Sequence, residues 1–135
     1  MFTFGREHEL KCAVEYPRSE KNKRLAAATV NAVHDYLEGL VSLEEAGTTI
    51  RTSFIEGGSG VWEQAGSWLR KLDAEAPEVS EWWQELAQHN SATVRFRVAC
   101  HLDDIQPPSQ QAIGKQLLTD KSKKVREMAD ARLND

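Results

Sequence analysis

Apolar positions in the last third of the chain recur in two similar blocks. Residues 86–102 read LAQHNSATVRFRVACHL, and residues 117–133 read LLTDKSKKVREMADARL. At an offset of 31 positions, the Val-Arg pair at 94–95 falls on the Val-Arg pair at 125–126. Because self-similarity at a period of roughly 20–50 residues is the signature of repeat architectures, this pattern predicts stacked helical units.

The spacing of apolar residues predicts helices along most of the chain. Residues 42–55 are ambiguous, because Thr48–Ile55 is rich in β-branched residues but has no evident strand partner, and we interpret them as a helical turn plus loop. The sequence EGGSG at 56–60 predicts a hinge or helix start; it lacks the lysine and hydroxyl residue of a nucleotide-binding P-loop. The expected helices cover residues 5–16, 19–40, 61–72, 79–89, 92–103, 109–118 and 122–133.

The polar turn, the Val-Arg pair and the small and leucine positions that follow it resemble HEAT-type repeats of the short, roughly thirty-residue variety. The resemblance covers residues 60–135. It implies an all-α fold, a short right-handed α-solenoid of antiparallel helix pairs. Residues 1–58 do not match the pattern and are expected to form a divergent helical N-terminal cap within one domain, 1–135.

The two blocks differ on one side. Phe96 of the first block is replaced by Glu127 in the second, and Ala99 is replaced by Asp130. Since an internal repeat buries both flanks whereas a terminal repeat needs a polar outer side, the second block is expected to close the array.

The composition is typical of a soluble protein. The chain has 135 residues, 40% of them hydrophobic, and a formal net charge of −4, which is typical of one globular domain. Its two cysteines, Cys12 and Cys100, form no CxxC motif, so a disulfide framework is not expected. The N-terminal residues have no apolar h-region and no apolar run could span a bilayer, so the sequence predicts a cytoplasmic protein with no membrane association.

The charge is unevenly distributed. Between residues 35 and 85 there are eleven acidic and only three basic side chains, and basic clusters flank this stretch at 18–24 and 115–126. Solvated faces explain such runs most simply. The functional alternative is an acidic surface that attracts a basic partner.

All four tryptophans lie in this acidic stretch. Trp68, Trp82 and Trp83 fall on apolar stripes and are expected in the core, whereas Trp62 lies at the edge of its stripe. An edge tryptophan is either a core-edge residue or an anchor for a partner. The predicted partner-binding residues are Trp62, Glu63, Asp73, Glu75, Glu78, Glu81 and Glu85.

Candidate chemistry is sparse. His8 and Cys12 are four positions apart on an expected helix, but no second pair with metal-ligand spacing accompanies them, so no metal site is predicted. His101 falls on the stripe of Val98 and Leu102 and is expected to be partly buried and hydrogen-bonded. No serine or cysteine has an evident base, so the sequence predicts neither an enzyme nor a cofactor.

These observations favour a non-catalytic protein-binding module. The profile of size and charge fits a stoichiometric inhibitor, such as a bacterial immunity protein that neutralises a toxin through an acidic surface. Two alternatives remain. The basic patch at Lys115–Arg126, extended by Arg95 and Arg97, could hold nucleic acid, although the acidic net charge counts against it. The chain could also be the scaffold subunit of a larger enzyme.

Overall fold

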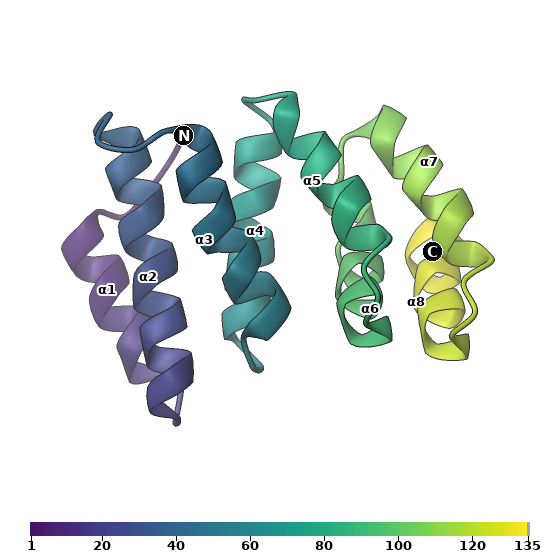
Figure 1. Ribbon diagram of the computed structural model, residues 1–135, viewed down its shortest axis with the longest axis horizontal. Coiled ribbons are helices and arrows are strands. Elements are labelled where there is room, and N and C mark those ends of the chain that lie inside the picture. The colour runs from purple at the N-terminus through teal and green to yellow at the C-terminus, as the bar shows by residue number, and fades with distance from the viewer. Residues whose placement is uncertain (135) are drawn as a thin grey trace. The chain divides into compact units, whose positions relative to one another are not determined.

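The computed structural model describes residues 1–134, which form eight α-helices, one short 3-10 helix and no strand (Figure 1). The chain is therefore all-α, as the apolar spacing predicted. The helices are α1 (Arg6–Glu15), α2 (Glu20–Leu37), α3 (Leu43–Glu56), α4 (Val61–Asp73), α5 (Glu78–Ala87), α6 (Ala92–Cys100), η1 (Leu102–Asp104), α7 (Pro107–Leu118) and α8 (Lys123–Asn134).

The helices divide into two compact units, Met1–Leu69 and Arg70–Asp135. The division falls inside α4 rather than at the glycine-rich stretch 56–60, where the sequence pattern changes. Each unit has its own buried core.

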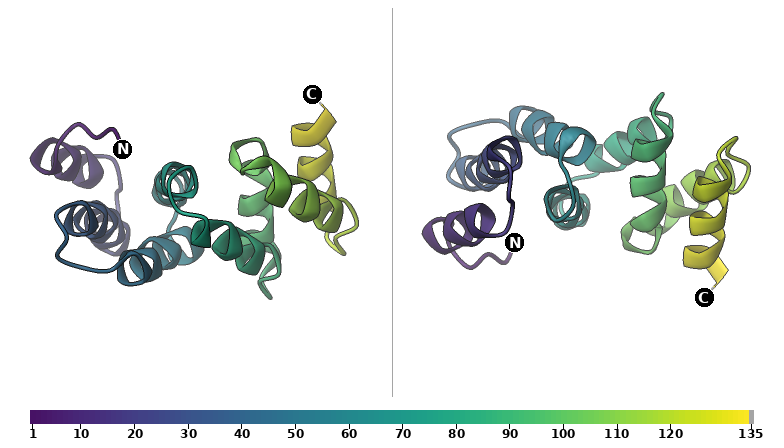
Figure 2. Two further views of the ribbon diagram at one scale, coloured as in Figure 1. Left: turned by 90° about the horizontal axis from the view of Figure 1, so that it is seen from above. Right: turned by 90° about the horizontal axis from the view of Figure 1, so that it is seen from below.

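In the first unit, α2 packs against α1 on one side and α3 on the other (Figure 2). Ile50 and Phe54 of α3 are fully buried, and Val30 and Val33 of α2 are nearly so. These residues recur at helical spacing, so each helix turns one apolar stripe inward.

Residues 43–56 form the regular helix α3, with Ser42 as its N-cap, so the interpretation of residues 42–55 as a helical turn plus loop was wrong. Ser42 Oγ accepts a hydrogen bond from the Glu45 backbone N–H at 3.1 Å, and Glu45 accepts one from the Ser42 N–H, which makes a capping box. The Thr48 and Thr52 hydroxyls donate to backbone carbonyls four residues earlier. Burial of Ile50 and the cap together outweigh the modest helix propensity of β-branched residues.

In the second unit, α5 lies beside α7 and α6 lies beside α8, while α7 also contacts α8 and α5 contacts α6. The core contains Trp83, Leu102, Ile113, Leu117 and Val125, each at most 1% exposed. Trp82 and Trp83 are buried here and Trp68 is buried in the first unit, which confirms the core positions expected for them.

Among the boundaries that differ from the sequence pattern, such as the end of α2 at Leu37 rather than at residue 40, two have clear local reasons. The helix expected over 92–103 ends at Cys100 and continues as the 3-10 turn η1. The helix expected from 109 begins at Pro107, because the first helical position needs no N–H donor and proline suits it.

Candidate protein-binding surface

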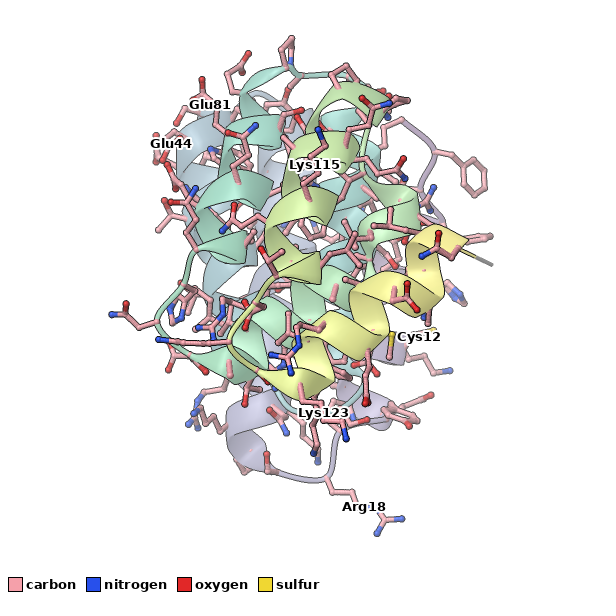
Figure 3. All side chains as sticks on the ribbon, turned by 90° about the vertical axis from the view of Figure 1, so that its right-hand side faces the viewer. Cys12, Arg18, Glu44, Glu81, Lys115 and Lys123 are labelled. Carbon is pink, nitrogen blue, oxygen red and sulfur yellow. The ribbon has the colours of Figure 1, made fainter. Side chains whose placement is uncertain are left out.

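Exposed carboxylates form a stripe along α5. Glu78, Glu81 and Glu85 are three and four positions apart, so they share one helix face, and all three are exposed. The opposite face buries Val79, Trp83 and Leu86. Trp82 of the same helix is also buried. Figure 3 labels Glu81 on the outside of its helix. We call these three glutamates the α5 acidic stripe.

The helix dipole favours only part of the α5 acidic stripe. Glu78 and Glu81 lie in the first turn, where the helix dipole favours a negative charge. Glu85 lies in the last turn, where the dipole disfavours one. It also follows Glu81 by four positions, a like-charge spacing that destabilises a helix by about 0.2–0.5 kcal/mol. Glu75, exposed in the turn before α5, adds a fourth carboxylate to this end of the second unit.

Trp62 and Glu63 belong to the first unit, whereas the other predicted partner-binding residues belong to the second. Trp62 is half-buried at the start of α4, where its ring meets Phe54 edge-on with ring centroids 6.2 Å apart. Glu63 Oε1 accepts a hydrogen bond from the Gly60 N–H at 2.7 Å. Both side chains therefore have a structural role at the junction of α3 and α4.

Asp73 lies in the interior rather than on a surface. It is 5% exposed, its Oδ1 accepts from the Ser80 hydroxyl at 2.8 Å, and its Oδ2 accepts from the Gln106 N–H at 3.4 Å. The carboxylate thus joins α4, the start of α5 and the segment before α7. Its place among the predicted partner-binding residues needs correction, because a buried, hydrogen-bonded group is not accessible to a partner.

Arg95, which belongs to the repeated Val-Arg pair, is a buried cation that binds parts of the protein itself. The residue is 6% exposed, and its guanidinium donates to both carboxylate oxygens of Asp120, at 2.8 and 3.3 Å. It also donates to the carbonyls of His89 and Asn90 at 2.8 and 3.0 Å. Arg95 therefore ties the turn before α6 to the turn before α8.

Arg126, which aligns with Arg95, makes one equivalent contact. Arg95 donates to the carbonyl of His89, six positions earlier, and Arg126 donates to the carbonyl of Asp120, also six positions earlier, at 2.7 Å. The two turns match further: the Ser91 N–H donates to His89 Nδ1 and the Ser122 N–H donates to Asp120 Oδ1. Asp120 was not among the predicted functional residues. It lies 31 positions after His89, the same offset that relates the two repeated blocks, and this offset could have indicated that the two residues have equivalent positions.

The basic patch is smaller than the sequence suggested. Arg95 is removed from it by burial, and Arg126 is engaged by the Asp120 carbonyl. Lys123 Nζ lies 3.7 Å from Glu127. Figure 3 labels Lys115 on α7 and Lys123 at the start of α8.

Two adjacent acids, Asp103 and Asp104, are explained by contacts within the second unit. Asp104 Oδ2 lies 3.2 Å from His101 Nδ1, and Asp103 lies 3.5 Å from the guanidinium of Arg132. His101 is 8% exposed, and its ring centroid lies 5.7 Å from that of Trp83. The expectation of a partly buried, hydrogen-bonded His101 is confirmed.

His8 and Cys12 lie together on α1, with Sγ 3.6 Å from Nε2. Within residues 1–134, no group of three histidine, cysteine, aspartate or glutamate side chains is arranged to hold a metal ion. Both residues are exposed. This pair alone provides too few ligands for a zinc site.

The glycine-rich stretch is packed against its own unit. The Gly58 N–H donates to Asn22 Oδ1 at 3.0 Å, and a Cβ at Gly57 would lie 2.5 Å from the Ser53 carbonyl oxygen. The Gly60 N–H donates to Glu63 Oε1. These amides are therefore directed at side chains of the protein, which favours a helix start over a phosphate-binding loop.

No protein-family model, curated protein or solved structure matches the chain. None of the helices that the structure describes is both long and apolar enough to cross a membrane.

Proposed function

We propose that this chain is a non-catalytic protein-binding module built on a short HEAT-like α-solenoid. The paired contacts of Arg95 and Arg126 support the repeat, because residues at the same offset make the same backbone hydrogen bond. The pairing of α5 with α7 and of α6 with α8 is the side-by-side arrangement that stacked helix pairs produce.

The α5 acidic stripe is the observation that carries the binding proposal. Its carboxylates are exposed on a helix whose opposite face buries Val79, Trp83 and Leu86, so the charges are carried by a helix packed against the core. Such a surface attracts a basic partner from a distance and orients it. Glu75 extends the same surface, whereas buried Asp73 positions the turn that leads into it.

By analogy, the role that suits this profile is that of a stoichiometric inhibitor, as in bacterial immunity proteins that neutralise a toxin. A toxin that acts on nucleic acid presents a basic cleft, and an acidic helix can occupy that cleft and exclude the substrate. This role requires recognition but no catalytic group of the inhibitor itself.

The test begins with affinity capture of the partner from the producing cells and continues with titration of the purified pair. Affinity is expected to fall about tenfold or more between roughly 0.05 M and 0.5 M salt, because exposed charges are screened. Replacing Glu78, Glu81 and Glu85 together by lysine should weaken binding by a similar or larger factor.

A matched control reverses three exposed glutamates elsewhere, Glu7, Glu15 and Glu127, and so changes the net charge equally. Local recognition predicts that this control binds nearly as well as the original protein. Equal loss in both variants, or an affinity insensitive to salt, would rule out the α5 acidic stripe as the binding surface.

A further inference from the structure

The two faces of α2 are held in different ways. Toward α3, the Thr29 hydroxyl donates to Ser53 Oγ at 2.7 Å, and Ser53 Oγ donates to the Leu25 carbonyl at 3.0 Å. Thr29 and Ser53 are buried, beside the fully buried Ile50 and Phe54. This face combines apolar burial with satisfied hydrogen bonds, which resists both water and salt.

Toward α1, the contacts of α2 are dominated by charge. Arg6 donates to Asn31 Oδ1 at 3.0 Å and to Asp35 Oδ1 at 2.8 Å, and it also bonds the Glu38 carboxylate. The Arg6 and Asp35 side chains are 31% and 34% exposed. Hydrogen bonds to Asp35 and then Glu38 raise the pKa of Arg6, so the guanidinium stays charged. Ion pairs at this exposure are weakened by salt.

Apolar burial contributes little to the docking of α1. No residue of α1 is buried. Among its apolar side chains, Leu10 and Ala13 are half-buried. Val14 within the helix and Phe4 just before it are exposed. The inner contact is instead polar: Glu9 Oε1 lies 2.5 Å from His34 Nε2, with both side chains nearly buried.

We infer that α1 is a latch, which swings away from α2 while α2 and α3 remain folded. The opening would occur at the connection between α1 and α2, residues 16–19, where Pro17 interrupts the helical path. Opening breaks the Arg6 and Glu9 contacts and brings His34 into water, together with Asn31 and Asp35. The α5 acidic stripe takes no part in this opening, so the experiments that test the latch do not depend on the proposed binding function.

Hydrogen exchange on the full chain tests the latch. An isolated ten-residue helix is marginal in water, so α1 loses its own hydrogen bonds once it leaves α2. Its amides are therefore expected to exchange about tenfold or more faster than those of α3, with the difference widening between roughly 0.05 M and 1 M salt. Arg6→Ala should accelerate exchange of α1 further and leave α3 unchanged. Lys11→Ala, which removes an exposed charge from the same helix, is the control and should leave both rates unchanged.

Chemical modification of His34 by diethyl pyrocarbonate gives a second readout, with the exposed His8 as an internal reference. The ratio of His34 to His8 modification should rise in Arg6→Ala and at high salt. Equal exchange of α1 and α3, a joint acceleration of both in Arg6→Ala, or an unchanged His34 ratio would each overturn the latch.

Discussion

The Arg95 guanidinium and the Asp120 carboxylate form a two-point ion pair in which both side chains are 7% exposed. The two residues are 25 positions apart, Arg95 in α6 and Asp120 in the turn between α7 and α8. Arg95 simultaneously satisfies two backbone carbonyls before α6, so one side chain fixes two connections at once.

Removing Arg95 should therefore be strongly destabilising. Arg95→Ala leaves the Asp120 carboxylate without its cation, with only the Ser122 N–H still donating to it, and takes the guanidinium donor from two carbonyls. Breaking a buried pair from one side costs about 3–5 kcal/mol. Urea unfolding should show this loss, and Arg95→Lys should recover only part of it, because an ammonium lacks the planar fork of donors. Arg126→Ala, which removes an exposed arginine with a single backbone contact, serves as the control and should cost about 1 kcal/mol. Equal losses at the two positions would contradict this distinction.

Asp120 should make stability depend on acid pH. Burial acts to raise the pKa of this carboxyl, but hydrogen bonds from Arg95 and the Ser122 N–H, with the charges of Arg95 and Lys121, outweigh it and lower the pKa below 3.8. The unfolded chain then binds the proton more readily than the folded chain. The stabilisation is present above the unfolded pKa and is lost as pH falls through the folded pKa.

The matching experiment compares unfolding of the original protein and of Asp120→Asn between roughly pH 6 and pH 3. The variant should be less stable near neutrality and should lose less stability as the pH falls. Parallel pH profiles for the two proteins would mean that Asp120 is not the group responsible.

Asp73→Asn should destabilise the second unit by about 1–3 kcal/mol, because Ser80 and Gln106 donate to different carboxylate oxygens and the substitution turns one of these acceptors into an NH2 group. Thermal unfolding is a suitable measurement. Glu78→Gln, the same chemical change at an exposed position, should stay within about 0.5 kcal/mol. A neutral effect at Asp73 would show that its carboxylate is dispensable in the interior.

Ser42→Ala should weaken the first unit through the start of α3. Loss of the capping box removes the acceptor for the Glu45 N–H, at a cost of about 0.5–2 kcal/mol. Ser59→Ala, at an exposed serine in the following turn, is the comparison. If both variants unfold at the same urea concentration, the cap has no energetic role.

The nucleic-acid alternative predicts a shift of a short duplex in a low-salt gel. We expect no shift at micromolar protein, because burial takes Arg95 out of the basic patch and a broad basic face is needed for duplex binding. A shift that disappears when Lys123 and Lys124 are replaced by glutamate would instead favour nucleic-acid association.

The sequence was sufficient where local patterns decide structure. Apolar residues at helical spacing located most helices, since burial of one stripe stabilises each of them, and the tryptophans Trp68, Trp82 and Trp83 fell in the core as expected. Residues 42–55 were missed because a cap at one end and burial of Ile50 override weak propensities, and neither is visible in apolar spacing alone.

The charged residues were less predictable. Asp73 and Glu75 are both acids in one acidic stretch, yet the first is buried and the second exposed. Asp73 accepts hydrogen bonds from the Ser80 hydroxyl and from the Gln106 N–H, 33 positions away, and apolar spacing reveals neither contact. The same holds for Arg95, whose carboxylate partner is identified only by folding.

The division inside α4 has a consequence for cutting the protein into fragments. A protease prefers exposed, irregular segments, and the junction of the two units after Leu69 lies within a helix rather than in a loop. A genetic truncation at this junction would split α4 and separate the buried Trp68 and Leu69 from the buried Leu72. Fragments intended to isolate either unit should therefore retain the whole of Val61–Asp73.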